Sequence, residues 1–561
     1  MSRTAVLGVP VPALAAGHPA LPWVLSLLAG LAGAWAMLPL PVLLGTAPFW
    51  DNPRGIVGGS WADMLTASSG YVAFVRDGWR WPLFQVAGLG REGANVLFTD
   101  SVPVVALAGR LLFRLTGQVV PLYGLWTLVC VVGMGLACTA LVRALGARSP
   151  AAALIGVSMP ALVGRWGHLA LMGQAVIPLS FVIYLRLRAG LRLRAGTALV
   201  WSLGLCLGAL LVHPYLLLMA VGVMAAAILQ GATDRRLSWR AAAGVLAALA
   251  GTTGTAMWAM GYGASSGAAS DVGFGVYSAN LLSLVAPYGG TLPGGGAFVL
   301  DGTGGQYEGA AFLGFGVLLL LLLGWREMVA SLASAVPRHP WLLAAVAGFS
   351  ALAVSNEVHL GGLHLLSVPL PDQVLWLLGA VRSSGRFAWV AAYLLAAVAV
   401  TVVARRRDGA RLLLVAAALQ FGGVALLRQG IRTAASAMPQ PVLDRAAWMA
   451  ALPGAGQLVV DPPFACLPRD ESSAPLRKAA IELQWMAAQS AVPTNTLYAA
   501  RTRPDCAVPA LAGRSIVAYL RPAAPPAGLA CQAGPLMTVC GLPPLPAPLA
   551  VIAAEDDPAA P

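Results

Sequence analysis

The sequence predicts an α-helical polytopic membrane protein that ends in a small α/β domain. Of its 561 residues, 58% are hydrophobic and only 10% are charged, whereas soluble proteins carry roughly 25% charged residues. Long apolar runs alternate with short arginine-bearing loops, as in proteins that cross a bilayer repeatedly. A polar segment with four cysteines follows the last run. These features exclude an ordinary soluble protein.

About eleven apolar runs are candidate spans, since a straight span needs roughly 20 residues. The first run, 21–44, lacks a clear Ala-x-Ala-like cleavage site, so we expect a spanning helix and not a signal peptide. The other runs fall at about 119–142, 150–164, 169–185, 197–212, 214–230, 241–260, 311–325, 341–355, 386–404 and 412–428. Several are short, so the count is approximate.

The positive charges predict the orientation. The net charge of +13 comes almost entirely from arginine, Lys478 being the lone lysine. With a cytoplasmic N-terminus, the arginine-rich loops at 143–148, 186–194, 235–240 and 405–411 all fall inside, as short cytoplasmic loops should. The loops 46–118 and 261–309, the segment 356–385 and the C-terminal tail are then outside. Arginines spread in this way do not predict nucleic-acid binding.

The cysteines test that orientation independently. Cys130, Cys138 and Cys206 lie in apolar runs, and the remaining four lie in the tail: Cys466, Cys506, Cys531 and Cys540. An even number in a segment placed outside predicts disulfides. Three connectivities are possible, and we favour Cys466 with Cys506 and Cys531 with Cys540. A zinc site competes, but no Cys-x-x-Cys occurs.

The tail has the pattern of a small α/β domain. Strands are expected at 457–460, 515–520 and 536–539, and an amphipathic helix over 474–489 with Ile481 and Trp485 on one face. The predicted domains are a membrane domain over 1–437, the α/β domain over 438–545, and a Pro- and Ala-rich disordered end over 546–561.

Carboxylates in the first outer loop are candidate functional groups. Asp63 and Asp100 flank a Trp- and Arg-rich segment that contains Arg76 and Trp79. Asp51, directly after the first apolar run, is a further candidate. Carboxylates beside a membrane suggest function by default. The structural alternative is helix capping, because Ser60-x-x-Asp63 fits a capping pattern and Asp100 precedes a Pro-initiated helix.

Other outer residues could complete a site. Arg382 and Arg386 lie outside against the prevailing charge bias, which suggests an anionic partner. Pairing with Glu357 or Asp372 is the structural alternative. His168 is more often a structural group than a ligand in such a position. Tyr307 and Glu308 end the glycine-rich loop, which could order over a substrate or act as a flexible connector. No Gly-Lys-Ser/Thr follows, so this loop is not a P-loop.

Several strings resemble an uncharacterised family of bacterial membrane proteins similar to the GT-C class of glycosyltransferases. The matching strings are Gly70-Tyr71-x-x-Phe74-x-Arg76-x-x-Trp79-x-Trp81-Pro82-Leu83, Thr99-Asp100-Ser101-x-Pro103, Arg165-x-Gly167-His168-x-x-Leu171, Asn280-Leu281-Leu282, Gln306-Tyr307-Glu308-Gly309, Arg382-Ser383-Ser384-Gly385-Arg386 and Pro493-Thr494-Asn495-Thr496-Leu497-Tyr498-x-Ala500-Arg501. The resemblance implies a GT-C-like fold in the bacterial inner membrane with a periplasmic tail domain.

The resemblance also implies a chemistry. Such an enzyme transfers a sugar from a polyprenyl-phosphate lipid to a cell-envelope acceptor, usually with inversion. Asp63 would be the base, with Asp51 as the other candidate, and Asp100 would orient the acceptor or hold a divalent metal such as Mg or Mn. Arg382, Arg386 and Arg76 would bind the donor phosphate. His168, Tyr307, Glu308 and Trp79 would contact substrate. The alternative is a non-catalytic lipid-binding or transporting protein of envelope assembly.

Overall fold

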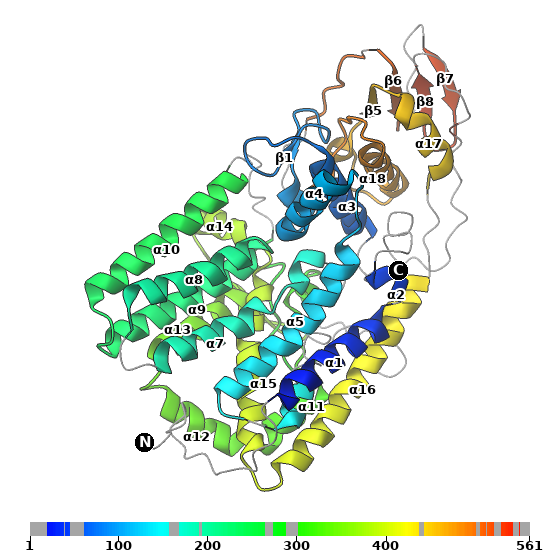
Figure 1. Ribbon diagram of the computed structural model, residues 1–561. Helices are drawn as coiled ribbons and strands as arrows, with labels where there is room; N and C mark the ends of the chain where they lie inside the picture. Colours follow the sequence, from blue (N-terminus) through cyan, green and yellow to red (C-terminus); the bar gives the residue numbers. More distant parts are fainter. Residues whose placement is uncertain are drawn as a thin grey trace.

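The structure of the protein is a computed structural model with a large helical part and a small α/β part packed at one end (Figure 1). It describes residues 20–38, 40–44, 61–147, 149–155, 168–189, 193–263, 273–287, 301–436, 442–500, 505–511, 513–520, 529–541 and 549.

Within these residues, six helical segments are long and apolar enough to cross a membrane. They are α5 (Tyr123–Ala144), η3 (Leu169–Met172) continued by α7 (Val176–Ala189), α9 (Pro214–Thr233), α10 (Trp239–Met260), η6 (Ser384–Phe387) continued by α15 (Ala388–Ala404), and α16 (Gly409–Ser436). The pair α11 (Phe315–Leu323) and α12 (Trp325–Ala335), bent by 76°, would be a seventh span. The predicted count of about eleven is therefore not confirmed.

Shorter apolar helices account for the difference. They are α1 (Leu21–Met37), α8 (Ala195–Leu210), α13 (Pro340–Val354) and α14 (Asp372–Leu378) continued by η5 (Gly379–Val381). Most of them occupy runs that the sequence marks as apolar, but each is shorter than the ~20 residues of a straight span. The run at 150–164 lies mostly outside the described residues, which show its beginning as helix up to Ile155.

Several spans share one direction. The start of α5 lies beside the first loop, because the Tyr123 hydroxyl donates to the Ala67 carbonyl at 3.1 Å. The ends of α5 and α15 also lie together, since Arg405 donates to the Leu145 carbonyl at 3.0 Å. Like these two helices, α7 and α9 lead into arginines, at 186–188 and 235–236. The starts of η3 and α9 lie on the side of the first loop, because His168 lies 3.9 Å from Asp100 and its ring meets the His213 ring edge-on. All four helices therefore have arginines at the end away from that loop.

The segment expected as the first outer loop is largely structured. Its described residues, 61–118, contain α3 (Trp61–Arg76), β1 (Gln85–Val86), β2 (Ala94–Asn95), η2 (Val96–Thr99) and α4 (Pro103–Thr116), whereas the short α2 (Leu40–Leu43) lies in the first apolar run. Helix α4 begins with proline at its first position and ends at Gly117, whose φ of 70° suits glycine. Arg110 lies buried on α4 and stacks 3.6 Å over the Phe74 ring, which fixes α4 against α3.

The C-terminal domain has a four-stranded sheet of order β5-β6-β8-β7. Its strands are β5 (Gln457–Asp461), β6 (Ser515–Tyr519), β7 (Ala530–Ala533) and β8 (Thr538–Gly541), with β5 and β6 parallel and the other pairs antiparallel. Helix α18 (Ala474–Gln489) is as predicted, and short elements surround it: α17 (Arg445–Ala451), η7 (Leu452–Gly454) and η8 (Phe464–Cys466). The favoured disulfides, Cys466–Cys506 and Cys531–Cys540, are confirmed. The predicted disordered end lies outside the described residues except for Leu549.

This domain packs directly on the first loop, with α18 beside α3 (Figure 1). The Trp485 indole donates to the Ser68 hydroxyl at 3.2 Å, although the two residues are 417 positions apart. Backbone bonds join the same two parts, since the Thr494 amide donates to the Gly88 carbonyl at 3.1 Å. The first loop and the tail therefore lie on one side of the helical part.

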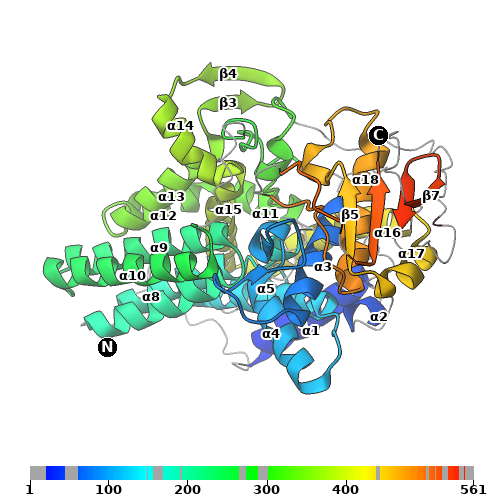
Figure 2. The same ribbon diagram turned by 90° about the horizontal axis from the view of Figure 1, so that it is seen from above.

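A hairpin and helix α14 form a separate projection between α13 and α15 (Figure 2). The hairpin consists of β3 (Glu357–Leu360) and β4 (Leu363–Ser367), and η4 (Gln306–Gly309) packs beneath it. Asn280 ties these segments together, because its side-chain amide donates to Gln306 Oε1 at 2.9 Å and to the Gly361 carbonyl at 2.8 Å.

Candidate functional site

Four charged residues from distant elements lie near enough to Asp100 to influence its carboxylate. Their charges act on it directly: Asp63, Glu308, Arg382 and Arg386. Asp63 lies in the first turn of α3, Asp100 directly follows η2, Glu308 belongs to η4, and the arginines flank the start of η6. The first loop and the segment before α15 therefore approach each other here, and they bring the candidate residues Asp63, Asp100, Arg382 and Arg386 near one another.

Asp100 adopts a left-handed backbone conformation, with φ of 58°. The α4 helix begins after Val102, which is its N-cap residue, so Asp100 does not cap it. Burial is the main cause that raises the pKa of Asp100 to about 7, and the negative charge of Asp63 adds to this effect. About 30% of its side-chain surface stays exposed. A carboxyl that is half protonated near pH 7 and accessible to solvent suits proton transfer or hydrogen bonding to a substrate.

Asp63 contacts the C-terminal domain. The Tyr498 hydroxyl donates a hydrogen bond to Asp63 Oδ1 at 3.2 Å. Asp63 lies in the first turn of α3, where a carboxylate is favoured by the helix dipole, so the capping alternative is compatible with this position. Ser60 of the capping pattern and the candidate Asp51 lie outside the described residues.

Arg386 and Glu308 form a buried ion pair. Arg386 Nε lies 2.9 Å from Glu308 Oε2, and the side chains are only 8% and 11% exposed. The Arg386 guanidinium also lies 5.0 Å from the centre of the Tyr215 ring. The predicted structural alternative, pairing with Glu357 or Asp372, is wrong for Arg386, and Glu357 instead pairs with His364 at 3.1 Å.

Two glycines let the elements of this ion pair approach each other. An added Cβ at Gly385 would lie 2.6 Å from the Cα of Gly309. An added Cβ at Gly309 would lie 2.5 Å from the Cα of Ala279. Only a residue without a side chain fits at such distances, so the arginine segment and η4 can pack backbone against backbone.

Histidines extend the cluster on the other side of Asp100. His168 Nε2 lies 3.9 Å from Asp100 Oδ1, and its ring meets the His213 ring edge-on at 6.1 Å. His213 precedes α9, and its Nδ1 accepts a hydrogen bond from the Tyr215 amide at 3.2 Å. Burial lowers the pKa of His213 well below its usual value, and the charge of Arg386 adds to this effect. His213 is therefore a neutral structural group, whereas His168 faces the acid.

Arg76 and Trp79 lie away from this cluster. Asp63 and Arg76 belong to the first and last turns of α3, and 13 residues of helix span about 20 Å. Arg76 donates to the carbonyls of Ala488, at 3.2 Å, and Gln489 at the end of α18. Trp79 is 60% exposed beyond α3. The expectation that these two residues join the phosphate- and substrate-binding groups is therefore not supported by their placement.

Tyr307 lies beside the ion pair, but it faces another tyrosine. Its ring is half-buried and meets the Tyr277 ring edge-on at 6.2 Å. Tyr277 is itself tied to the arginine segment, because its carbonyl accepts from the Gly385 amide at 2.9 Å. Tyr307 is thus adjacent to the site, in a supporting position.

Comparison with known proteins identifies the family. Residues 27–425 match the family described as "Domain of unknown function (DUF6311)", and residues 447–518 match the DUF6311 C-terminal domain. The chain belongs to the DUF6311 family. No curated protein and no solved structure matches this member of the family. The two matched regions contain both halves of the cluster, with Asp63 to Arg386 in the first and Tyr498 in the second.

A metal has no evident ligand set in the described part of this DUF6311 chain. No group of three or more His, Cys, Asp or Glu residues there is arranged to hold an ion. The carboxylates of Asp63, Asp100 and Glu308 are the nearest approach to one, and Glu308 is already paired with Arg386. We therefore derive no chemical step through a metal.

The sequence gives no indication of a role for Tyr498 or Tyr215. Tyr498 lies in the string 493–501, but nothing in the sequence reveals that a tail residue reaches the first loop. Tyr215 follows the His-Pro pair at the start of α9, and its hydroxyl accepts from the Ser383 amide at 2.9 Å. Both contacts join segments far apart in the chain, for which a single sequence carries no signal.

Proposed function

We propose that this protein is a membrane glycosyltransferase of GT-C-like architecture. It transfers a sugar from a polyprenyl-phosphate donor to a cell-envelope acceptor at the outer face of the bacterial inner membrane. The observation that carries the proposal is the meeting of Asp63 and Asp100 with Arg382 and Arg386 in one cluster. Acid groups for a base and fixed cations for a leaving phosphate are the two requirements of this reaction.

The helix directions support the proposed orientation. From Arg386 to Arg405, 19 residues of helix span about 28 Å, close to the ~30 Å of a bilayer core. Four helices end in arginine at the face remote from the cluster. Under the positive-inside rule that face is cytoplasmic, which puts the cluster outside. The two disulfides in the tail fit the same side, because an oxidising compartment favours them.

In the proposed mechanism, Asp63 accepts the proton of the acceptor hydroxyl. The hydroxyl oxygen attacks the anomeric carbon, and the bond from that carbon to the phosphate oxygen breaks. The electron pair leaves with the lipid phosphate, which Arg382 and Arg386 stabilise. Asp100, with a pKa of about 7, hydrogen-bonds the acceptor and orients it. Attack opposite the leaving group inverts the anomeric configuration.

A cavity gives some support to a second candidate, non-catalytic lipid binding or transport. It has a volume of about 530 Å³ and an almost entirely apolar lining from α7, α12, α13 and α15, including Phe181, Leu332, Leu342 and Leu394. Cavities of this size accommodate small molecules. A protein that only holds a lipid would use this cavity and would leave the donor chemically unchanged.

The test uses the protein in proteoliposomes with a panel of polyprenyl-phosphate monosaccharides as donors. Turnover is measured as the release of polyprenyl phosphate. We expect Asp63→Asn to lose at least 100-fold in rate, since general bases contribute about 10²–10⁴-fold. Asp77→Asn is the matched control, because Asp77 lies just beyond the opposite end of α3 in a pair with exposed Arg80. Full activity of Asp63→Asn would refute the proposal. Lipid binding without any turnover by the unmodified protein would favour the second candidate.

A further inference from the structure

We infer that the C-terminal domain completes the candidate site, with Tyr498 as a positioning residue for Asp63. The inference rests on the proposed function only in treating Asp63 as the base. Asp63 and Tyr498 are 435 positions apart and belong to the two separate family matches. The tail domain thereby supplies part of the site that the membrane domain lacks.

The Tyr498 hydroxyl donates a hydrogen bond to Asp63 and stays protonated. Its oxygen lies 3.2 Å from Asp63 Oδ1, and the side chain is half-buried. Burial raises the pKa of Tyr498 above its usual value, and the negative charges of Asp63 and Asp100 add to this effect. The phenol therefore keeps its proton at every pH of interest. A fixed O–H donor stabilises the ionised carboxylate and holds it in one orientation.

Contacts within the tail domain fix the position of Tyr498. Its amide donates to Gln484 Oε1 of α18 at 2.7 Å. Its ring packs on Phe464 with the ring centres 4.7 Å apart. Two residues later, the Ala500 amide donates to the Phe98 carbonyl of η2 at 2.7 Å, so the segment is held on both domains. The phenol is thus placed by side-chain packing, by the backbone and by the domain contact together.

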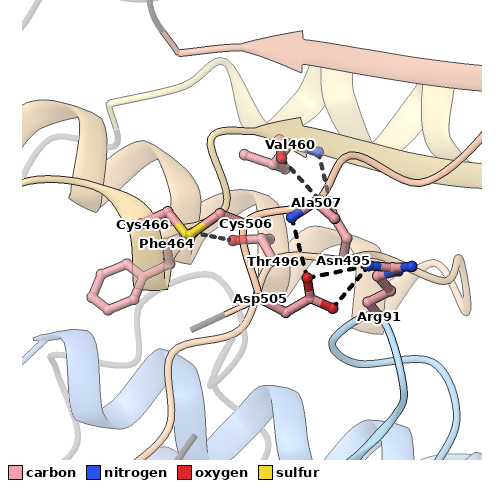
Figure 3. The surroundings of a disulfide bond; sticks show 9 residues. All are labelled: Arg91, Val460, Phe464, Cys466, Asn495, Thr496, Asp505, Cys506 and Ala507. Carbon is pink, nitrogen blue, oxygen red and sulfur yellow. Dashed lines mark hydrogen bonds and ion pairs between the residues drawn. A yellow bond between two sulfur atoms is a disulfide. The ribbon is translucent and has the colours of Figure 1, made fainter. Parts of the chain in front are cut away.

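The Cys466–Cys506 disulfide secures Phe464 (Figure 3). Cys466 follows Phe464 by two residues in η8, and the Phe464 amide donates to Thr496 Oγ1 at 3.0 Å. On the other side of the bond, Asp505 pairs with Arg91 of the first loop at 3.2 Å. The cross-link therefore connects the support of Tyr498 to the surface on which the domain docks.

A merely structural role for Tyr498 would give different results. Loss of a structural contact lowers stability and reduces the rate by the same factor at every pH. Loss of a donor to the base also moves the acidic limb of the rate profile, because the unsupported carboxylate is protonated at higher pH. The charged groups that act on Tyr498 besides Asp63 are Asp100 and Arg382. The groups next to Asp100 are Glu308, Arg386 and His168, and His213 lies beside His168. They are the same in the variant, so the comparison isolates the hydroxyl.

The first experiment compares Tyr498→Phe with the unmodified full-length protein. Phenylalanine keeps the ring that packs on Phe464, so the variant should fold. We expect the acidic limb of kcat/KM to move up by about one to two pH units, a roughly 10- to 100-fold change in the ionisation constant of Asp63, because the carboxylate loses a hydrogen-bond donor. Tyr519→Phe, a buried tyrosine of β6 away from Asp63, is the control and should leave the profile unchanged.

A second readout needs no transferase activity. Carbodiimide modifies protonated carboxyl groups, so mass spectrometry can follow labelling of Asp63 against pH. In Tyr498→Phe its midpoint should move up by the same amount. A shifted midpoint in a protein that transfers no sugar would support this inference and refute the proposed function. An unchanged midpoint in Tyr498→Phe would overturn the inference, whether or not the protein is an active transferase.

The disulfides provide the third comparison. Cys466→Ser with Cys506→Ser should move the Asp63 midpoint in the same direction as Tyr498→Phe, because Phe464 is released. Cys531→Ser with Cys540→Ser should not, since that bond joins β7 and β8 at the far edge of the sheet. Equal midpoints for the two double variants would contradict the proposed role of Cys466–Cys506.

Discussion

Arg386 and Glu308 lie 78 positions apart in the chain, yet their side chains form a buried pair at 2.9 Å. The pair joins the segment before α15 to the end of the glycine-rich loop. It also fixes the charge of the site, because both groups act on the carboxyl of Asp100. A buried ion pair of this kind is costly to break, since the remaining charge has no compensation.

Glu308→Ala should destabilise the protein by about 3 kcal/mol, because it leaves the Arg386 charge buried without its partner. Denaturant unfolding in detergent micelles would measure the loss. Asp505→Ala removes one member of the exposed pair with Arg91, whose side chains are 40% and 45% exposed, and should cost at most about 1 kcal/mol. Equal effects of the two variants would contradict the buried pairing.

Asp100→Asn should make stability less dependent on pH. The pKa of Asp100 is about 7 in the folded protein and about 4 when unfolded, so the folded state binds the extra proton in this window. The stabilisation that this bound proton provides is complete below about pH 4 and is lost as the pH rises through 7. With 30% of the side chain exposed, the loss should be roughly 1–2 kcal/mol at pH 8. Melting temperatures from pH 5 to 8 should therefore fall less in the variant, and parallel curves would contradict the raised pKa.

Gly385→Ala should disrupt the cluster, because the new Cβ would meet the backbone of Gly309 at 2.6 Å. Overpacking of this kind costs about 1–3 kcal/mol, and here it also separates Arg386 from Glu308. Gly362→Ala in the β3–β4 hairpin is the control, since its Cβ would have no atom within 4 Å. Thermal unfolding and binding of a polyprenyl phosphate should both change in the first variant. Normal values for Gly385→Ala would disprove the close approach.

Labelling of introduced cysteines should reveal the orientation. Arg80→Cys, beyond α3 on the side of the cluster, should react with a membrane-impermeant maleimide in intact spheroplasts. Arg407→Cys, after α15, should react only after permeabilisation. Both arginines are exposed, so access to reagent is the single difference between them. The reverse labelling pattern would place the cluster in the cytoplasm and would exclude an outer-face transferase.

The apolar helices were predicted well, because a hydrophobic run is a local feature that can be recognised whatever the tertiary arrangement. The count of about eleven spans is not confirmed, because helices such as α8 and α13 are apolar but short, with 16 and 15 residues. Helices α3 and α4 mix apolar and polar residues, so their segment was expected as a loop. Strand β7 was missed because Ala530–Ala533 carries no β-branched or aromatic residue.

The candidate site was predictable only in part. Arg382 and Arg386 stood out because they violate the charge bias of the outer loops, and the structure places them with Asp63 and Asp100. Arg76 carried the same charge and shared the segment of Asp63, but the length of α3 separates them. The sequence shows that Asp63 and Arg76 belong to one segment. Their distance depends on whether that segment is a helix and on where the helix begins and ends.

The contact between Asp63 and Tyr498 also sets an order for biogenesis. Helix α3 leaves the ribosome about 400 residues before the segment 474–498, which packs on it. Until synthesis reaches that point, the acid at the start of α3 has no phenol beside it. A nascent or truncated chain therefore lacks this contact between the two domains, which forms only after most of the chain has been synthesised.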